Sequence, residues 1–321
     1  MPVALLIIAI ILVILLLALL LSCFYFYHTA ISRREKTFLA EDPSLQEVNR
    51  TSADETPWIE QQSFEIIDIR SYDGLRLRGY FLRAPEPTTK TVILAHGYGG
   101  EAKKDMGGFA HLYYETLGFN VLLPDARGHG QSEGNYIGFG WHERKDYVQW
   151  IHTLIQRLGE NIEIVLHGVS MGGATVLMTS GENLPPQVKC IISDCAYTSV
   201  VDILSYQAKR MYHLPPFPFV PVTSLICRLL AGYSFEEASA LKQVAKAKIP
   251  ILFIHGDTDT FVPTAMVYPL YEQCKSSPKE LYLVPGAEHA MAYTVDPVTY
   301  TSRISQFIDH CLQPAQPIPT I

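Results

Sequence analysis

The chain has 321 residues, of which 48% are hydrophobic, and its formal net charge at pH 7 is -7. This length fits one large α/β domain with an appendage and is short for two full domains. The acidic balance and the lack of a basic tract or an aromatic-plus-basic pattern argue against a nucleic-acid-binding protein.

The first segment of the chain is an apolar run long enough to cross a membrane. Residues 3–21 are all Val, Ala, Leu or Ile. At about 1.5 Å of rise per residue, a helix over them spans roughly 28 Å, close to the thickness of a bilayer core. Aromatic residues at 24–27 and basic residues at 33, 34 and 36 follow, as is typical of the membrane surface. We therefore predict a single-pass anchor in residues 1–30.

A cleaved signal peptide and a lipoprotein signal ending at Cys23 are the alternatives to an anchor. Both require a positively charged segment before the apolar run, and only Met1 and Pro2 precede it. The run is also longer than the apolar core of an ordinary signal peptide. These features favour an uncleaved anchor.

The charges beside the span predict its orientation. All nearby positive charge follows the span, which by the positive-inside rule places the large domain in the cytoplasm. The six cysteines show neither metal-ligand spacing nor a disulfide framework, in agreement with that compartment. The tripeptide Asn49-Arg50-Thr51 matches a glycosylation acceptor, a pattern that often arises by chance.

Residues 31–62 separate the apolar run from the rest of the chain. They are polar and mixed in charge, and Pro43 and Pro57 interrupt any helix. We predict a juxtamembrane linker with one or two short helical pieces, followed by a single domain over residues 63–321.

That domain alternates apolar strands with helices. Residues 64–70 and 75–82 form two strands joined by the turn at Asp73-Gly74. Further strands are expected at 91–95, 120–124, 162–166, 188–193, 249–255 and 280–284, and helices at 105–117, 141–158, after residue 173 and at 297–312. Apolar strands separated by helices imply a mostly parallel sheet that is covered on both faces.

The interval from 198 to 247 breaks this alternation. It contains no strand pattern, and it includes a run of prolines and phenylalanines at 215–221 between two helix-like segments. A structureless loop of that length would be improbable inside a compact domain. We therefore predict a small, mostly helical lid at about 199–247, inserted after the sixth strand.

The segment Gly168-Val169-Ser170-Met171-Gly172 lies directly between a strand and a helix. A G-x-S-x-G pattern in that context is typical of the nucleophile elbow, a tight turn that holds its serine in strained dihedrals. The hydroxyl is thereby raised above the sheet at a helix N-terminus, where backbone N–H groups can stabilise an anion. Ser170 is our candidate nucleophile.

A serine nucleophile needs a base to take its proton and a carboxylate to orient that base. His289 lies in the loop between the last strand and the last helix, where the base is expected, whereas His255 is assigned to packing at a strand end. Asp259 and Asp257 both follow the strand at 249–255. We favour Asp259 because it is far enough into the loop to reach His289, while Asp257 suits the turn and Asp194 is a less favoured substitute.

An oxyanion formed on the substrate needs two N–H donors. Met171, the residue after the nucleophile, is expected to supply one, and Tyr98 in the glycine-rich loop 96–100 the other. The loop 125–132 also contains Asp, His and Ser, but we assign it to loop architecture near the pocket. The sequence contains no phosphate-binding glycine loop and no zinc-binding helix motif, so no cofactor and no metal are expected.

With these motifs in this order, the chain resembles the α/β-hydrolase superfamily from about residue 64 to its C-terminus. It is most similar to the lipase, esterase and peptidase-like serine hydrolases with a modest lid and an N-terminal membrane segment. Members with an aspartate nucleophile are disfavoured because position 170 is serine. The resemblance implies hydrolysis through an acyl-enzyme and does not name the substrate.

We therefore predict a membrane-anchored serine hydrolase that cleaves carboxylic esters, with lipid-derived esters as candidates. Its predicted partners are a small ester or acyl substrate and the membrane. An aminopeptidase or a thioesterase with the same triad is the main alternative, and an acidic lid pocket, for which Glu236-Glu237 is a candidate, would favour the peptidase. A non-catalytic binding protein with the same fold is the second alternative. The oligomeric state is not indicated by the sequence.

Overall fold

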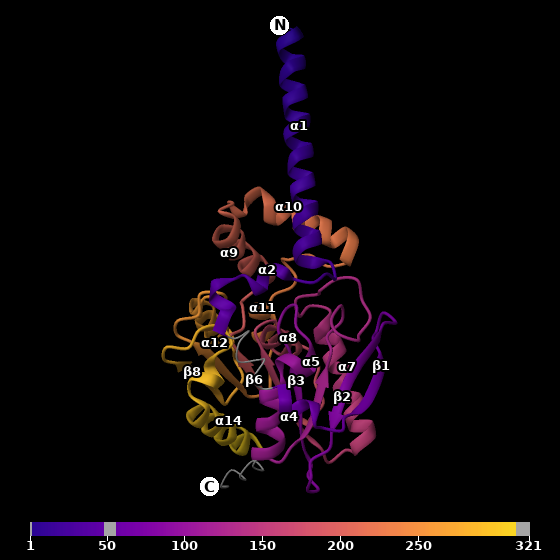
Figure 1. Ribbon diagram of the computed structural model, residues 1–321, viewed down its shortest axis with the longest axis vertical. Coiled ribbons are helices and arrows are strands. Elements are labelled where there is room, and N and C mark those ends of the chain that lie inside the picture. The colour runs from indigo at the N-terminus through magenta and orange to yellow at the C-terminus, as the bar shows by residue number, and fades with distance from the viewer. Residues whose placement is uncertain (1, 48–55, 313–321) are drawn as a thin grey trace, which may run out of the picture.

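The computed structural model describes residues 2–47 and 56–312, in which one sheet of eight strands forms the centre of the domain (Figure 1). The strand order is β1-β2-β4-β3-β5-β6-β7-β8. β2 pairs antiparallel with β1 and β4, and the other neighbours are parallel. The strands are β1 (Glu65–Arg70), β2 (Arg76–Leu82), β3 (Lys90–Ala95), β4 (Asn120–Pro124), β5 (Glu163–Val169), β6 (Val188–Asp194), β7 (Ile251–Gly256) and β8 (Lys279–Val284).

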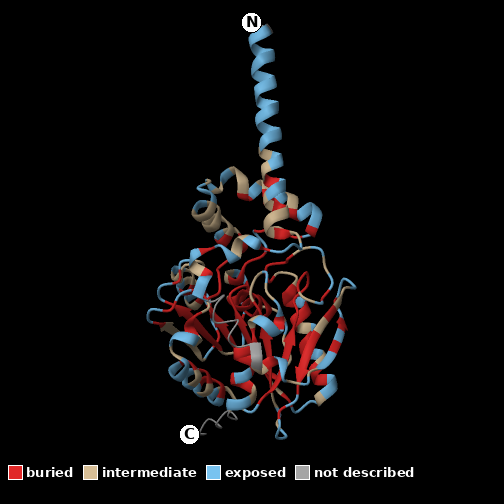
Figure 2. Ribbon diagram, in the orientation of Figure 1, coloured by how far each residue is buried: buried red, intermediate tan, exposed pale blue. Residues whose placement is uncertain are grey.

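Helices cover both faces of this sheet, so the predicted α/β architecture is confirmed. One face packs on α7 (Glu143–Leu158), α8 (Met171–Thr179), α11 (Ala240–Val244) and α12 (Val267–Gln273). The other packs on α4 (Thr56–Glu60), α5 (Ala102–Asp105), α6 (Gly107–His111), η3 (Leu112–Thr116) and α14 (Pro297–Leu312). The central strands are buried almost completely (Figure 2), because their side chains alternate between these two apolar layers.

The predicted helix over 105–117 is broken into α5, α6 and the π-helical turn η3. Gly107 and Gly108 lie at this break, where glycine lowers helix propensity. The predicted turn residues behave as expected, since Gly74 and Gly118 both have positive φ, +91° and +70°.

The N-terminal helix α1 (Pro2–Phe26) rises alone from one end of the domain, and most of its length is exposed (Figures 1 and 2). It ends in a π-helical turn, η1 (Tyr27–Ile31). At this base the chain is tied to the domain, because Cys23, Tyr27 and Ile31 are buried and the Ile31 carbonyl accepts the N–H of Ile137.

Two further segments surround that base. The linker contributes α2 (Thr37–Ala40) and η2 (Pro43–Leu45), while the acceptor tripeptide at 49–51 lies outside the described residues. The interval after β6 contains α9 (Val200–Tyr212), α10 (Pro216–Ala231) and α11, and α9 and α10 lie around the foot of α1 (Figure 1). The remaining short helices are η4 (Thr264–Met266) and α13 (Ala292–Val295).

Candidate active site

Ser170 sits in the sharp turn between β5 and α8, with φ +59° and ψ -118°. Few L-residues adopt such a backbone, and the turn leaves no room for side chains around it. A Cβ on Gly168 would lie 2.1 Å from the Gly172 carbonyl oxygen, and one on Gly172 would lie 1.9 Å from that of Ala95. The glycines on either side of the serine are therefore required by backbone contacts.

The structure brings Ser170, His289 and Asp259 into one hydrogen-bonded chain. His289 Nε2 lies 2.8 Å from Ser170 Oγ, and His289 Nδ1 lies 2.7 Å from Asp259 Oδ2. All three residues are buried, and they come from the loops that follow β5, β7 and β8. Because parallel strands end at the same edge of a sheet, residues far apart in the sequence meet there.

The Asp259 carboxylate is held in place from both sides. Its Oδ1 accepts the N–H groups of Phe261 and Val262, each at 2.9 Å. Burial alone would raise the pKa of Asp259, but the charge of His289 and the hydrogen bonds from His255 and His289 lower it well below its usual range. The carboxylate is thus ionised at neutral pH and accepts a hydrogen bond from the imidazole.

The two competing aspartates have other partners. Asp257 Oδ1 accepts the N–H of Gly286 at 2.7 Å and so organises the turns after β7 and β8. Asp194 Oδ2 accepts the hydroxyl proton of Tyr300 at 2.8 Å, and burial raises its pKa. Within the described residues, neither carboxylate has a hydrogen bond to His289.

His255 has a larger part in the site than its expected role in strand packing. Its Nε2 donates to the Val262 carbonyl at 2.9 Å and lies 3.2 Å from Asp259 Oδ2, on the same oxygen that faces His289. The sequence carries no signal for this contact, because a spacing of four residues brings side chains together in a helix, whereas His255 lies in β7 and Asp259 in the loop after it.

The two predicted oxyanion donors lie beside the serine. Gly97 is close to it, since a Cβ there would lie 3.7 Å from Ser170 Cβ. The neighbouring N–H of Tyr98 has no hydrogen-bond acceptor in the described part of the chain. Met171 is the first residue of α8, so its N–H has no acceptor within the helix.

Histidines of the surrounding loops fix the backbone that carries Tyr98. His129 Nε2 accepts the N–H of Gly99 at 3.2 Å, and His96 Nε2 accepts that of Ala126 at 3.0 Å. Burial, together with the nearby His96, lowers the pKa of His129 to about 3, so the ring is a neutral acceptor. The loop 125–132 therefore supports the site, as predicted, rather than forming a second one.

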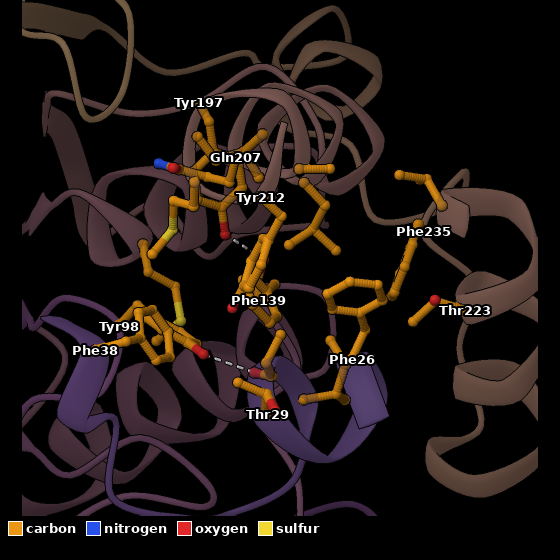
Figure 3. A pocket seen from close by; sticks show the side chains of 18 of the residues that line it. Phe26, Thr29, Phe38, Tyr98, Phe139, Tyr197, Gln207, Tyr212, Thr223 and Phe235 are labelled. Atoms are coloured by element: carbon orange, nitrogen blue, oxygen red, sulfur yellow. Dashed lines mark hydrogen bonds between the residues drawn. The ribbon is translucent and has the colours of Figure 1, made fainter. Parts of the chain in front are cut away.

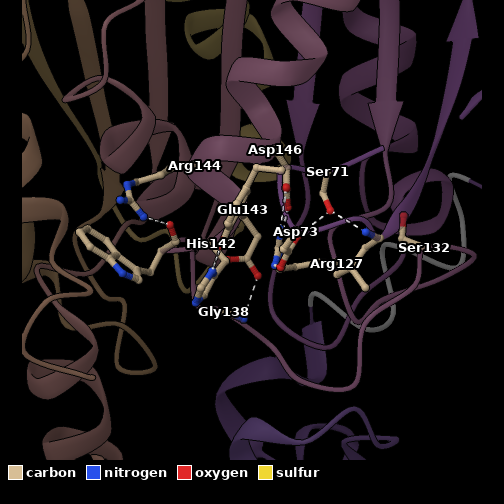
Figure 4. Close-up of polar contacts among 12 residues, drawn as sticks. Ser71, Asp73, Arg127, Ser132, Gly138, His142, Glu143, Arg144 and Asp146 are labelled. Carbon is tan, nitrogen blue, oxygen red and sulfur yellow. Dashed lines mark hydrogen bonds and ion pairs between the residues drawn. The ribbon is translucent and has the colours of Figure 1, made fainter. Parts of the chain in front are cut away.

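An ion-pair network continues from that loop into α7 (Figure 4). The fully buried Arg127 guanidinium donates to Asp146 at 2.7 Å and to Asp73 at 2.8 Å. Glu143 accepts the N–H groups of Gly138 and Gly140. These contacts join the β1–β2 hairpin, the loop after β4 and the first turn of α7.

A cavity of about 130 Å³ is lined in part by Ser170. Figure 3 shows side chains that line this cavity. Its walls come from the foot of α1, the linker, α9, α10 and the loops after β3 and β7, and no charged residue lines it among those described. Glu236 and Glu237 are exposed and lie outside this lining. The contribution of α1 and its terminal turn, through Phe26, Thr29, Ala30 and Ile31, was not expected from the sequence, since residues 1–30 were assigned to the membrane anchor and residues 31–62 to a linker.

Cys195 also approaches the site. One ligand atom each from Cys195, Asp259 and His289 lies within 4.8 Å of the others, a grouping that could hold a metal ion. Both ring nitrogens of His289 are already engaged with Asp259 and Ser170, which accounts for the grouping without an ion.

The chain is similar to known proteins over most of its length. A family model described as "alpha/beta hydrolase fold" matches residues 90–219, and one described as "Serine aminopeptidase, S33" matches residues 218–295. The uncharacterized protein YqkD of Bacillus subtilis is 33% identical over 252 residues, which cover 78% of this chain and 80% of YqkD. The chain belongs to the α/β-hydrolase superfamily. This hydrolase is also 24% identical over 250 residues to the uncharacterized membrane protein YNL320W of Saccharomyces cerevisiae, covering 77% of this chain and 80% of that one.

Solved structures share the fold of this α/β hydrolase. The esterase Pf2001 of Pyrococcus furiosus superposes with a TM-score of 0.64 at 24% identity, over 80% of this chain and 96% of the esterase. The acylaminoacyl peptidase of Pyrococcus horikoshii superposes with a TM-score of 0.56 at 18% identity, over 82% of this chain and 44% of the peptidase. The fold is therefore shared by an esterase and a peptidase among these neighbours.

Proposed function

We propose that this α/β hydrolase is a membrane-anchored serine hydrolase that cleaves carboxylic esters through an acyl-enzyme. The observation that carries the proposal is the hydrogen-bonded chain from Ser170 through His289 to Asp259, at 2.8 Å and 2.7 Å, below an apolar cavity. A strained, buried serine of this kind has a chemical use in a hydrolase and none in a binding protein on the same fold.

In this mechanism Ser170 Oγ attacks the ester carbonyl carbon while His289 Nε2 accepts the hydroxyl proton. Asp259 holds the His289 tautomer that keeps Nε2 free of a proton, and it stabilises the imidazolium that forms. The N–H groups of Tyr98 and Met171 donate to the oxyanion of the tetrahedral intermediate, each contributing about 3 kcal/mol of barrier lowering. His289 then gives the proton to the leaving alcohol, and water, activated by the same base, releases the acid.

The cavity supports an apolar acyl group as the recognised part of the substrate. Its lining is formed by aromatic and aliphatic side chains, with Thr29, Gln207 and Thr223 as polar members beside Ser170. Burying an acyl chain against such walls is favourable by about 0.8 kcal/mol per methylene. The lid proposed at about 199–247 supplies α9 and α10 to these walls.

An aminopeptidase is the second candidate, because the "Serine aminopeptidase, S33" model matches residues 218–295. A substrate with a free amine calls for an acidic group in the pocket, and the described lining offers none. A thioesterase would use the same machinery and the same cavity, so only measured turnover separates it from the esterase.

A substrate panel tests this proposal. Purified full-length protein is assayed on esters of increasing acyl length, on the matching thioesters and on aminoacyl amides. We expect esters to be turned over fastest, and Ser170→Ala to lower turnover by about a millionfold, whereas substitution of the exposed Ser302 by alanine leaves it unchanged. Faster cleavage of aminoacyl amides than of esters would replace the proposal with the aminopeptidase.

We also propose that α1 crosses the membrane and that the large domain faces the cytoplasm. Support comes from the 3–31 helix, which has mean hydropathy 3.7 in its most apolar window, and from Arg33 and Arg34 directly after it. Protease treatment of intact and of permeabilised cells tests the orientation. The protease should cleave the domain only in permeabilised cells. Cleavage in intact cells would place the domain on the outer side of the membrane.

A further inference from the structure

The two faces of α10 carry the opposite chemistry from that of a helix on a water-soluble protein. Its buried side is small or polar, with Thr223, Ser224, Cys227 and Ala231 beside Val220. Its exposed side carries large apolar side chains, namely Leu225 (57% exposed), Leu229 (76%) and Leu230 (54%), and Phe217 (79%) is exposed at the non-helical start of this segment. A helix facing water buries its apolar stripe and exposes its polar one. The outward face of α10 therefore matches an apolar environment.

The Ser224 hydroxyl on the buried side is satisfied inside the protein. Ser224 Oγ donates to Glu236 at 2.7 Å and accepts the N–H of Phe235 at 3.0 Å. These bonds fix which side of α10 turns inward, so the leucines cannot turn toward the core without leaving these polar groups unpaired.

The exposed apolar face continues the surface of the apolar span. α10 packs against the lower end of α1, where Cys23 Sγ lies 3.7 Å from the Phe219 carbonyl oxygen and the rings of Phe26 and Phe219 are 6.0 Å apart (Figure 1). Arg228 shares the exposed face, and a long cationic side chain there can extend to the headgroups while its stem stays apolar. A membrane crossed by α1 would therefore meet α10 where α1 leaves the domain.

Three aromatic side chains separate this face from the cavity over Ser170. Phe26, Tyr212 and Phe219 come from α1, α9 and α10, and all three line the cavity. Phe26 and Tyr212 are labelled in Figure 3. The ring of Phe26 lies 5.2 Å from Tyr212 and 6.0 Å from Phe219. None of the three is buried, and Tyr212 is 38% exposed. These rings form part of the cavity wall on the side of α1 and α10, together with Thr29, Val220 and Thr223.

We propose that α10 lies in the interfacial layer of the membrane that α1 crosses, and that the acyl chain of the substrate passes from the bilayer between Phe26, Tyr212 and Phe219 to Ser170. The inference rests on the proposed anchor and on the proposed ester hydrolysis. The exposed face of α10 contacts a lipid surface, and the acyl chain of an apolar substrate reaches Ser170 without passing through water. The exposed leucines then serve as a membrane contact rather than a protein interface.

Fluorescence quenching measures the depth of α10 without reference to activity. Full-length Leu229→Trp is placed in phosphatidylcholine vesicles that contain brominated acyl chains. The wild type, which has three tryptophans, gives the background fluorescence. Val298→Trp is the control, because position 298 on α14 is 79% exposed. We expect the brominated lipid to quench strongly the fluorescence of the tryptophan added at position 229. The tryptophan added at position 298 should not be quenched. Absence of lipid quenching at position 229, whether the site is then open to an aqueous quencher or covered by another protein, overturns the membrane contact.

Hydrolysis tests the route of the acyl chain. The double variant L225Q/L229Q is compared with Val298→Gln on a long-chain ester embedded in vesicles and on a short ester in water. We expect the ratio of embedded to soluble turnover to fall by about fivefold or more, given the apolar area that leaves the lipid, and the control to keep the wild-type ratio. An unchanged ratio in the double variant overturns the route. If the wild type cleaves neither ester while the indole of Leu229→Trp is quenched by lipid, the ester proposal fails and the membrane contact stands.

Discussion

The Asp259 carboxylate receives more contacts than its pairing with His289 requires. Two backbone N–H groups hold Oδ1, and His255 shares Oδ2 with His289. We infer that His255 is a positioning residue, which sets the direction from which Asp259 meets the base. Sequence position alone assigned His255 to strand packing, because the loop path that returns Asp259 toward it is not encoded in local periodicity.

We predict that His255→Leu lowers kcat by about 10- to 100-fold with little change in KM, since a small displacement of the base affects the reacting geometry and not substrate binding. The exposed His152→Leu is the matched control and should behave as the wild type. Steady-state kinetics on one soluble ester gives kcat and KM for the wild type and both variants. A rise in KM with unchanged kcat would contradict the positioning role.

At the scale of elements, the strands could be predicted well and the helices less well. Each strand is a short apolar run between turn residues, and all eight predicted strands are present within about three residues of their expected ends. The helix at 105–117 is broken at its glycines, and the contact of α1 with the domain was not foreseen. The side chains that contact the domain, Cys23, Tyr27 and Ile31, follow the uniformly apolar run, in a segment that the sequence assigned to the membrane surface.

The nucleophile elbow gives the sharpest test at this scale. We predict that Gly172→Ala lowers the free energy of unfolding by about 3 kcal/mol or more, because its Cβ would lie 1.9 Å from the Ala95 carbonyl oxygen in the adjacent strand β3. Gly107→Ala in α6 is the control: its φ is not positive and the added Cβ would lie 3.6 Å from Ile59 Cδ1, an ordinary contact, so it should change the free energy of unfolding by less than about 1 kcal/mol. Denaturant titration of the detergent-solubilised chain measures both. An equal loss of unfolding free energy in the two variants would contradict the role of the contact with the Ala95 carbonyl.

At the scale of the whole molecule, buried neutral histidines tie stability to pH. Burial lowers the pKa of His167 to about 3, and burial together with His96 lowers that of His129 to about 3. An unfolded histidine has a pKa of about 6.5. Below that pH the unfolded chain binds protons that the folded chain does not, so acid favours unfolding.

We predict that the free energy of unfolding falls as the pH drops below about 6.5, by up to roughly 1.4 kcal/mol per pH unit for each of these two histidines. Denaturant titrations at about pH 7.5 and about pH 5.5 measure the slope. His167→Gln should show a smaller slope than the wild type. Equal stability at the two pH values would contradict neutral burial of both rings.

Labelling with a fluorophosphonate probe, followed by peptide mass spectrometry, tests the proposed nucleophile most directly. We predict one covalent adduct on the peptide that contains Ser170, and its loss in Ser170→Ala and strong reduction in His289→Ala. An adduct on another serine, or ester hydrolysis that persists at the wild-type rate in Ser170→Ala, would contradict the account.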